Sequence, residues 1–369
     1  MIVLSDEQIM LRDMAKSWVA DRVPVSALRA VRTTYADHGS DPVLYTEMAE
    51  MGWTGILIPE AHGGVDMGLV SLGLIAEELG RNLAASPLLS TAVAAASAIV
   101  RGDNEAKKAE LLPAIATGSL TAALAIDEGP HHRPDNIAAT ARVDNDGWVL
   151  NGAKRGVAEA LSADLLIVAA KTDDGIALFA CPADREGVEK TRLARIDSRG
   201  AADLRFTNVR LDKAALLGSG QPYVDRVLDA LRAAQAAEML GGTVQAFETT
   251  LDYLRTRVQF DHPIGSFQAL QHRAADMMGE IELTRSAVYA ALTALDADDR
   301  DAPILTSLAK AMAGQTFRAM AKEMIQMHGG IGMTDEHDAG LYLKRAHTAD
   351  VELGNAAFHR ERYAQFLNI

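Results

Sequence analysis

The chain has 369 residues, 49% hydrophobic and 23% charged, which is the composition of an ordinary soluble globular protein with two or three domains. Lys and Arg number 36 against 50 Asp and Glu; the net charge of −14 argues against nucleic acid as a partner, because phosphates repel so acidic a surface. The single cysteine, Cys181, excludes an intrachain disulfide and a four-cysteine zinc site, and fits a cytoplasmic protein.

Residues 1–120 are expected to form an N-terminal helical domain. Ser5 followed by two acids and Gln8 is typical of a helix N-cap. Alanine and leucine dominate residues 69–112, and Pro and Gly residues divide the region into four to six short helices. The first residues carry acids where a secretion signal needs bases, and no run of about 20 apolar residues occurs, so we expect neither a signal peptide nor a membrane span.

Residues 121–215 change character and predict a middle β domain. Two turn signals, residues 144–147 and Asn151-Gly152, punctuate short apolar runs in the manner of β-hairpins. Short strands at this spacing favour a small β-barrel or sandwich. The expected strands are residues 137–143, 148–150, 165–168, 176–179 and 204–206.

Residues 216–369 return to helical periodicity and predict a C-terminal helical bundle. Apolar residues recur three and four positions apart in two clear stripes, at 244–258 and 267–281, and in a looser stripe at 304–327 that is rich in methionine. Each stripe is one buried face of a long helix. The methionines are interpreted as core residues rather than as a binding surface.

Four segments carry a more specific signal. They are MGWTGILIPEAHGG at 51–64 with EELG at 77–80, WVLNGAK at 148–154, YLRTRVQFDHPIGSFQALQHRAAD at 253–276, and QMHGGIGMT at 326–334. Together, and in this order, they resemble the acyl-CoA dehydrogenase family, flavoenzymes that introduce an α,β double bond into acyl-CoA thioesters. The resemblance covers essentially the whole chain. It implies a mainly α fold with a helical N-terminal domain, a small central β-barrel and a C-terminal four-helix bundle.

The resemblance also implies FAD as cofactor, an acyl-CoA substrate, and an electron-transferring flavoprotein or similar acceptor. In this family FAD lies across a subunit interface, and the neighbour's bundle holds its pyrophosphate and adenosine end. Arg257, Phe260 and Gln268 match one FAD-contacting segment, and Gln326 and Gly330 match the other. A guanidinium binds two pyrophosphate oxygens at once, and glycine lets backbone N–H groups approach the ligand. Each segment also has a plainer interpretation: Arg257 as a solvated helix residue, and residues 326–330 as a glycine C-cap.

The remaining histidines and the cysteine suggest no further chemistry. The histidines are scattered and show no metal-ligand spacing, so we expect no metal site. His328 lies in the second FAD-contacting segment but is given no catalytic role. Cys181 is interpreted as a small buried hydrophobe.

The sequence departs from the family at the general base, a Glu that removes the acyl α-proton. The usual position, before a Gly near the C-terminus, holds Leu353, and the alternative position on an earlier bundle helix holds Leu231. Glu352 is one residue from the usual place. On a helix that offset is about 100° of rotation and points the carboxylate elsewhere, whereas in a loop Glu352 could still reach the substrate.

The middle domain also differs from the family pattern. The family's Thr-Glu-Pro…Gly-Ser-Asp loop, which contacts flavin and substrate, is reduced here to Ile126-Asp-Glu-Gly-Pro-His131. The Trp-Ile-Thr segment that lines the isoalloxazine is replaced by Arg155-Gly-Val-Ala158. A further change is Asp261, where the family has Gly. A carboxylate beside a pyrophosphate is unfavourable unless it turns away or pairs with Arg257 or His262.

Three hypotheses follow. In the first, the chain is a subunit of a cytoplasmic two-component acyl-CoA dehydrogenase, as known in bacterial lipid or steroid catabolism, and lends its FAD-contacting residues to an α2β2 partner that carries the Glu. In the second, it is a self-sufficient homo-oligomer with Glu352 as a relocated base. In the third, it is a non-catalytic flavin-binding or structural member of the family. The acyl group cannot be read from the sequence.

Overall fold

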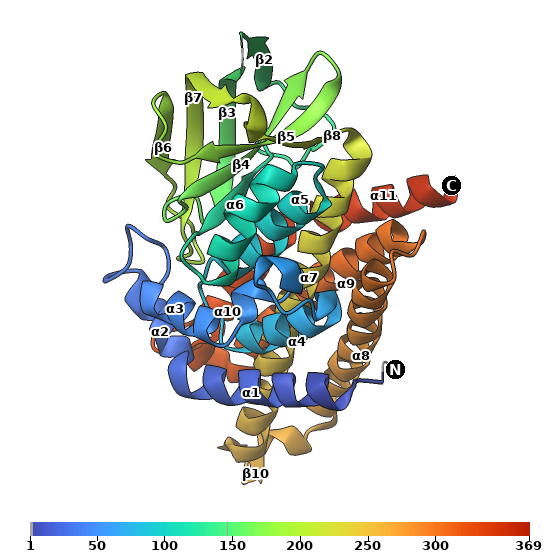
Figure 1. The fold of residues 1–369 in the computed structure, drawn as a ribbon. Coiled ribbons are helices and arrows are strands. Elements are labelled where there is room, and N and C mark those ends of the chain that lie inside the picture. The colour runs from blue at the N-terminus through green and yellow to red at the C-terminus, as the bar shows by residue number, and fades with distance from the viewer. Residues whose placement is uncertain (1–2, 146) are drawn as a thin grey trace. The chain divides into compact units, whose positions relative to one another are not determined.

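The computed structural model describes residues 3–145 and 147–369; Asp146, within the predicted turn 144–147, lies outside the described residues. The α-helices are α1 (Asp6–Arg22), α2 (Val25–Val31), α3 (Pro42–Glu50), α4 (Gly68–Arg81), α5 (Ala96–Arg101), α6 (Glu105–Ala116), α7 (Gln221–Thr256), α8 (Gln268–Asp296), α9 (Ala302–His328), α10 (Ala339–Val351) and α11 (Ala356–Leu367) (Figure 1). Short 3-10 or π segments are η1 (Trp53–Gly55), η2 (Glu60–His62), η3 (Leu89–Ala95), η4 (Lys213–Ala215), η5 (Ile264–Ser266) and η6 (Gly329–Met333).

The strands are β1 (Ala122–Ala125), β2 (Thr140–Asp144), β3 (Gly147–Ala158), β4 (Leu165–Thr172), β5 (Gly175–Pro182), β6 (Val188–Arg192), β7 (Ala201–Asp212), β8 (Leu216–Ser219), β9 (Val258–Gln259) and β10 (His262–Pro263). Helices, then strands, then helices follow one another, which confirms the predicted fold class. The predicted N-cap is a full capping box: the amide of Gln8 donates to Ser5 Oγ at 3.2 Å, and the amide of Ser5 donates to Gln8 Oε1 at 3.1 Å.

The chain packs into two compact units. One comprises the segment up to Ala27, Gly73–Ala84 and Arg232–Ile369, and it contains the helical bundle. The other comprises Leu28–Leu72 and Ala85–Leu231, and it contains the sheet β1–β8. The domain boundaries at residues 120 and 215 stay predictions.

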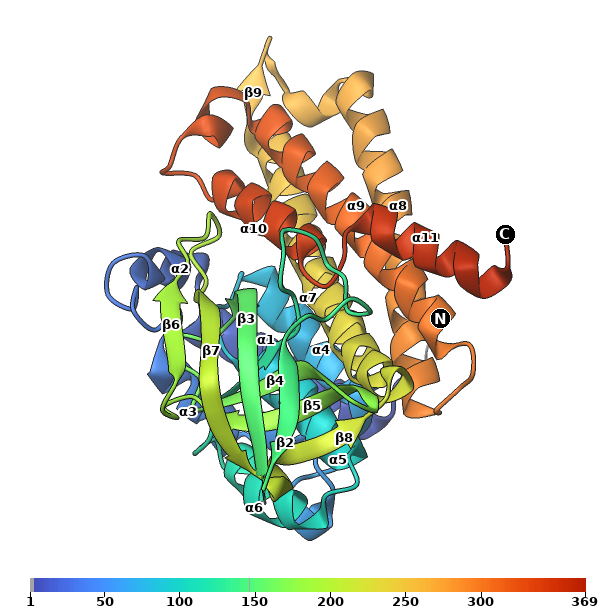
Figure 2. The ribbon, with the colours of Figure 1, turned by 90° about the horizontal axis from the view of Figure 1, so that it is seen from above.

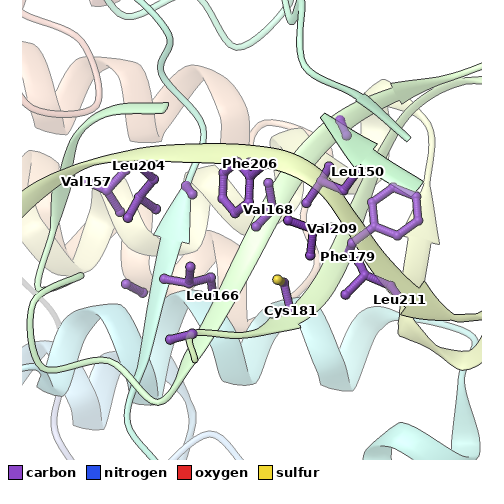
Figure 3. Packing of buried hydrophobic residues seen from close by; sticks show 14 of the residues in the cluster. Leu150, Val157, Leu166, Val168, Phe179, Cys181, Leu204, Phe206, Val209 and Leu211 are labelled. Carbon is purple, nitrogen blue, oxygen red and sulfur yellow. The ribbon is translucent and has the colours of Figure 1, made fainter. Parts of the chain in front are cut away.

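The eight-stranded sheet of the second unit has the order β6-β7-β3-β2-β4-β5-β8, with β1 paired to β4 in parallel. The long strands β3 and β7 lie side by side, and β4, β5 and β8 cross beneath them (Figure 2). A buried apolar cluster fills the space between, with Leu204, Phe206 and Val209 facing Leu166 and Val168 (Figure 3). In the described residues the end strands β6 and β8 are not paired, so the sheet does not close into the predicted barrel.

One predicted turn is wrong. Asn151-Gly152 does not end a hairpin, because β3 continues through it to Ala158 with a bulge between Leu150 and Gly152. Gly152 has φ 142°, and a Cβ added there would lie 2.7 Å from the Cα of Ala139. An Asn-Gly pair can adopt the backbone angles of a β-bulge as readily as those of a hairpin turn.

In the first unit the helices α8, α10 and α11 pack on α9. The apolar stripes at 244–258 and 267–281 lie on helices, as predicted, but neither is buried or helical over its whole predicted length. The first ends early, because α7 stops at Thr256 and Val258 enters the two-stranded β9–β10 hairpin. The second is buried only from Ile281 onward, while Leu270 and Met277 stay half-buried on the described chain.

The EELG segment explains how α4 meets the bundle. A Cβ at Gly80 would lie 1.9 Å from the carbonyl oxygen of Glu238, and one at Gly241 would lie 1.8 Å from that of Glu77, so the helices touch backbone to backbone. The Glu77 carboxylate accepts hydrogen bonds from Arg285 at 2.6 Å and from the Tyr289 hydroxyl at 2.7 Å on α8. These glycines are therefore packing residues of the first unit.

Candidate cofactor and catalytic site

The hairpin after α7 presents the first set of predicted site residues. Gln259 pairs with His262 and Val258 with Pro263, so Phe260 and Asp261 form a two-residue turn with φ 54° and 64°. Turns with two positive φ values favour Asn-Gly, so an aromatic residue here is conformationally costly. The Phe260 side chain is 86% exposed at the tip. The chain thus displays an aromatic ring outward at a strained position.

Arg257 and Gln268 flank this turn and also reach solvent. Arg257 follows the last residue of α7, and its carbonyl accepts the amide of Ile264 at 2.8 Å, which closes the base of the hairpin. Its guanidinium is exposed and forms no ion pair within the described residues. Gln268 is the exposed first residue of α8. An exposed, uncompensated guanidinium fits an anion supplied from outside the chain.

Asp261 does not compensate Arg257. Its carboxylate is exposed, and the described residues show no ion pair between it and either Arg257 or His262. The two pairings foreseen for this carboxylate, with Arg257 and with His262, are therefore not formed in the described residues, and the third arrangement, in which it turns away from the pyrophosphate, stays a prediction.

The second set of site residues lies at the end of α9. Gly329 has φ 64°, and its amide donates to the carbonyls of Ile325 and Gln326, which is the predicted glycine C-cap. A Cβ added at Gly330 would meet nothing within 4 Å, so the backbone there faces open space. Gln326 and Gly330 are both exposed. The loop is thus both a C-cap and an accessible backbone surface.

The structure brings these two sets of residues together within one unit. The Tyr253 ring, one turn before Arg257, stacks on the His328 ring with centroids 4.3 Å apart and an interplanar angle of 28°. Sequence reasoning gave neither ring a role, because a Tyr on an amphipathic helix and a His before a Gly pair are common without any ligand.

At the family's base position the chain has a tight turn between α10 and α11. Leu353 adopts φ 59°, and its aliphatic side chain cannot accept a proton. The neighbouring Glu352 Oε2 accepts hydrogen bonds from Gln235 Nε2 at 2.9 Å and from Arg345 Nη1 at 3.3 Å. Arg345 is buried and also pairs with the buried Glu238 at 2.8 Å. The Glu352 carboxylate is therefore held within the bundle by a cation and an amide.

Buried donors lock this turn from three helices. Lys310 Nζ donates to the carbonyls of Ala349, Asp350 and Gly354 at 2.9, 3.3 and 3.2 Å. The Leu353 carbonyl accepts from Arg232 at 3.3 Å and from His359 at 3.1 Å. Sequence reasoning missed these residues, because a lone Lys or Arg on a helix usually marks a solvated face.

The environment perturbs two of these groups. Burial lowers the pKa of Lys310 to about 7, opposed by the charges of Asp350 and Glu352. Burial, with the nearby Arg232 and Lys310, also lowers the pKa of His359 well below its usual range. Burial therefore disfavours the charged forms of both groups, although donation to three carbonyls requires all three protons of the Lys310 ammonium.

In the second unit, the loop that replaces the family's flavin-contacting loop is closed on itself. Asp127 accepts from His132 Nδ1 at 2.9 and 3.0 Å. Glu128 accepts from the amides of Ala138 and Ala139 and from Lys154 Nζ at 2.7 Å. Burial lowers the pKa of Lys154, and the hydrogen bond to Glu128 opposes that shift. Both carboxylates are therefore already engaged by the chain itself.

The segment that replaces Trp-Ile-Thr is likewise rebuilt. Gly156 has φ 62°, and its amide donates to Asp203 Oδ1 at 2.8 Å, within a register shift between Lys154 and Val157. A Cβ at Gly156 would meet nothing within 4 Å, so no side chain fills this place. Elsewhere in the sheet Cys181 is buried in the core, and burial raises its pKa to about 12, which confirms the packing role expected of it.

Comparison with known proteins identifies the architecture. Residues 5–119 match the N-terminal domain of acyl-CoA dehydrogenases, residues 128–212 the middle domain, and residues 218–367 the C-terminal domain. The chain belongs to the acyl-CoA dehydrogenase family. The sequence-based identification is thus confirmed, and FAD is the cofactor of this family.

Three relatives illustrate the range of the family around this chain. The acyl-CoA dehydrogenase IpdE2 of Mycobacterium tuberculosis is 31% identical over 93% of this chain and 91% of its own length. A variant of the Tcur3481–Tcur3483 steroid ACAD is 32% identical, covers 98% of both chains and superposes with a TM-score of 0.91. The ChsE4–ChsE5 complex of Mycobacterium tuberculosis is 25% identical, covers 99% of this chain and 98% of its own, and gives a TM-score of 0.92.

Two further findings concern membrane-spanning helices and metal sites. Among residues 3–145 and 147–369, no helix is long and apolar enough to cross a membrane. In the same residues no cluster of three or more His, Cys, Asp or Glu side chains has a metal-binding arrangement. The assignment of Arg257, Phe260, Gln268, Gln326 and Gly330 to FAD stays a prediction.

Proposed function

We propose that this chain is one subunit of an FAD-dependent acyl-CoA dehydrogenase, and that it lends bundle residues to FAD in a partner subunit that carries the catalytic Glu. One observation carries the proposal. The two family positions for the base hold Leu353 and Leu231, and Glu352, which precedes Leu353 in the chain, is bound by Gln235 and Arg345. An α-proton cannot be removed without a base, so the base comes from another chain.

The residues of the hairpin and the α9 loop fit the cofactor. Arg257 offers an exposed guanidinium with no ion pair in the described chain, Phe260 an exposed ring, and Gly330 an open backbone. When bound, FAD would supply the oxidant that accepts the hydride leaving the acyl Cβ while a base takes the proton from Cα. In this proposal Arg257 neutralises the pyrophosphate, Phe260 covers the cofactor, and Gln268, Gln326 and the Gly330 backbone supply hydrogen bonds.

The middle domain of this chain fits the flavin ring poorly, which supports the same division of labour. Asp127 is hydrogen-bonded to His132 and Glu128 to Lys154, so both carboxylates of this loop already have partners within the chain. The ring-lining segment is replaced by residues 155–158, in which Gly156 has no side chain and the space beside it is open. We infer that the working isoalloxazine lies on the partner's middle domain.

Similarity to two-chain proteins supports the assembly and suggests a substrate class. The Tcur3481–Tcur3483 protein is named a steroid ACAD, and ChsE4–ChsE5 is named a complex. We therefore propose an α2β2 assembly, a role in lipid or steroid catabolism, steroid-derived acyl-CoA thioesters as the first substrates to test, and an electron-transferring flavoprotein as acceptor. The single buried cysteine fits a cytoplasmic location.

The self-sufficient enzyme with Glu352 as base is the second candidate. It is favoured only by the loop conformation of residues 352–355, which frees Glu352 from the helical geometry that would point it away. Against it, a proton acceptor bonded to a buried arginine is a weak base, because the positive charge stabilises its ionised form.

The proposal is tested by co-expressing this chain with a homologous chain that has Glu at the usual base position, and by measuring native mass and FAD content. We expect a heteromer of two chains of each kind with about one FAD for each pair of chains. A stable homo-oligomer of this chain with one FAD per chain contradicts the proposal. An assembly without flavin supports the non-catalytic hypothesis instead.

A further inference from the structure

Three aromatic rings lie in a row at one end of the bundle. The Tyr253 ring at the end of α7 stacks on the His328 ring at the end of α9, with centroids 4.3 Å apart. The other neighbour of His328 is the His337 ring just before α10, with centroids 4.4 Å apart and planes at 50°. We call Tyr253, His328 and His337 the ring stack.

Hydrogen bonds fix the orientation of each ring. His328 Nδ1 lies 2.6 Å from the Met324 carbonyl oxygen, and since a carbonyl only accepts, Nδ1 carries the proton. The amide of Ala339 donates to His337 Nδ1 at 3.1 Å, so the proton of His337 lies on Nε2. The Tyr253 hydroxyl donates to the His328 carbonyl at 3.4 Å. Burial lowers the pKa of His328, which agrees with a neutral ring.

The ring stack joins the two segments assigned to FAD. The amide of Arg257 donates to the Tyr253 carbonyl at 2.9 Å, so Tyr253 lies in the helical turn directly before Arg257. His328 is followed directly by Gly329, whose left-handed conformation starts the exposed loop. Tyr253 and His337 are only half-buried. His328 between them is buried. The stack therefore runs from the bundle core to its surface at the point where the two proposed cofactor segments meet.

We propose that Tyr253, His328 and His337 are positioning residues that set the spacing between the Arg257 guanidinium and the Gln326–Gly330 loop. This inference rests on the proposed function, because it assumes that both segments hold one FAD. Two segments that hold one ligand in a single bound conformation must keep a fixed separation, and stacked rings with hydrogen-bonded edges resist sliding more than isolated side chains do. The rings need not touch the cofactor themselves.

A double-mutant cycle on the native flavin-containing assembly tests this role, with the rate of FAD dissociation as the readout. We expect Tyr253→Leu to raise that rate about tenfold and Tyr253→Phe, which keeps the ring, less than about twofold. His337→Ala, a milder change at a half-buried position, is expected to raise it about threefold. Tyr363→Leu on α11, a half-buried tyrosine outside the stack, is the matched control and leaves the rate unchanged.

The decisive comparison adds Arg257→Ala. If the stack acts by placing Arg257, Tyr253→Leu has little further effect once Arg257 is gone, so the two effects do not multiply. Effects that multiply, or a Tyr253→Leu or His337→Ala variant that releases FAD at the normal rate while Arg257→Ala releases it fast, overturn the inference and leave the FAD assignment standing. An unchanged rate in Arg257→Ala instead overturns that assignment, and the inference with it.

Discussion

At the scale of single residues, the site is defined by what its charged groups have and lack. The Glu352 carboxylate accepts hydrogen bonds from the Arg345 guanidinium and the Gln235 amide, whereas the Arg257 guanidinium forms no ion pair in the described residues. A carboxylate already bound to arginine is a structural group, and an uncompensated exposed guanidinium suits an external anion. Sequence reasoning found Arg257 through its motif. It could not settle Glu352, because the partners of Glu352 lie 7 and 117 positions away along the chain.

Arg257 is the first residue to test. In the proposed assignment, Arg257→Ala removes a charge-assisted contact to the pyrophosphate, typically worth about 1.5–3 kcal/mol, so FAD loss during gel filtration should rise visibly. Arg255→Ala is the matched control, because Arg255 pairs with Asp252 at 3.2 Å and is exposed on the last turn of α7. Unchanged flavin retention in Arg257→Ala counts against the pyrophosphate assignment.

Lys310 makes a prediction about pH. Its native pKa of about 7 lies below its usual 10.5, so between these values the unfolded chain binds more protons and stability rises with pH. Lys310→Met should destabilise the assembly by about 1–3 kcal/mol, because three carbonyls lose their donor. The loss should grow by about 1–2 kcal/mol from pH 7 to pH 9; the titration of the Cys181 thiol in the unfolded chain falls in this range but is common to both proteins and cancels in the difference.

Urea denaturation at fixed chain concentration measures this effect. Lys322→Met, an exposed position on the same helix, is the control and should show no pH-dependent loss. A Lys310→Met deficit that is the same at pH 7 and pH 9 shows that burial does not perturb this amine.

At the scale of elements, the turn of the hairpin β9–β10 combines a strained backbone with a negative charge near the proposed pyrophosphate site. Asp261 has φ 64° and a carboxylate next to the proposed pyrophosphate site. Asp261→Asn removes the charge and tolerates the same backbone, whereas Asp261→Gly removes the charge and relieves about 1 kcal/mol of strain. Both variants should slow FAD dissociation severalfold, and Gly should also stabilise the hairpin. Faster dissociation in the Asn variant would show that the carboxylate helps to hold the cofactor.

Periodicity predicted most of the elements but not where they change type. Continuous apolar runs located β4 and β5, which are buried on both faces, and helical periodicity located α8 and α9. The strands β6 and β8 were missed, since four or five residues with little alternation carry a weak signal. Asn151-Gly152 became a bulge because the close approach of Ala139, a tertiary contact, decides between turn and bulge.

At the scale of the whole molecule, the bundle keeps the residues that we propose to contact the cofactor, while the base position and the loops expected to face the flavin are altered. Family motifs showed this asymmetry in the sequence, because they compare residues at fixed positions. The structure shows how these altered positions are occupied. Glu352 is hydrogen-bonded to Arg345, Asp127 to His132, and Glu128 to Lys154. Buried ionic networks such as Arg345 with Glu238 have no sequence pattern, so only coordinates reveal them.

The central claim is that this chain lacks a base of its own, and acyl-CoA-dependent reduction of an electron acceptor tests it most directly. General-base catalysis typically contributes about 10²–10⁴ in rate, so the purified chain alone should be nearly inactive. Adding a homologous chain with Glu at the base position should restore turnover, and Glu352→Gln in this chain should leave that turnover nearly unchanged. Robust activity of the chain alone that collapses in Glu352→Gln would contradict the account and establish Glu352 as the base.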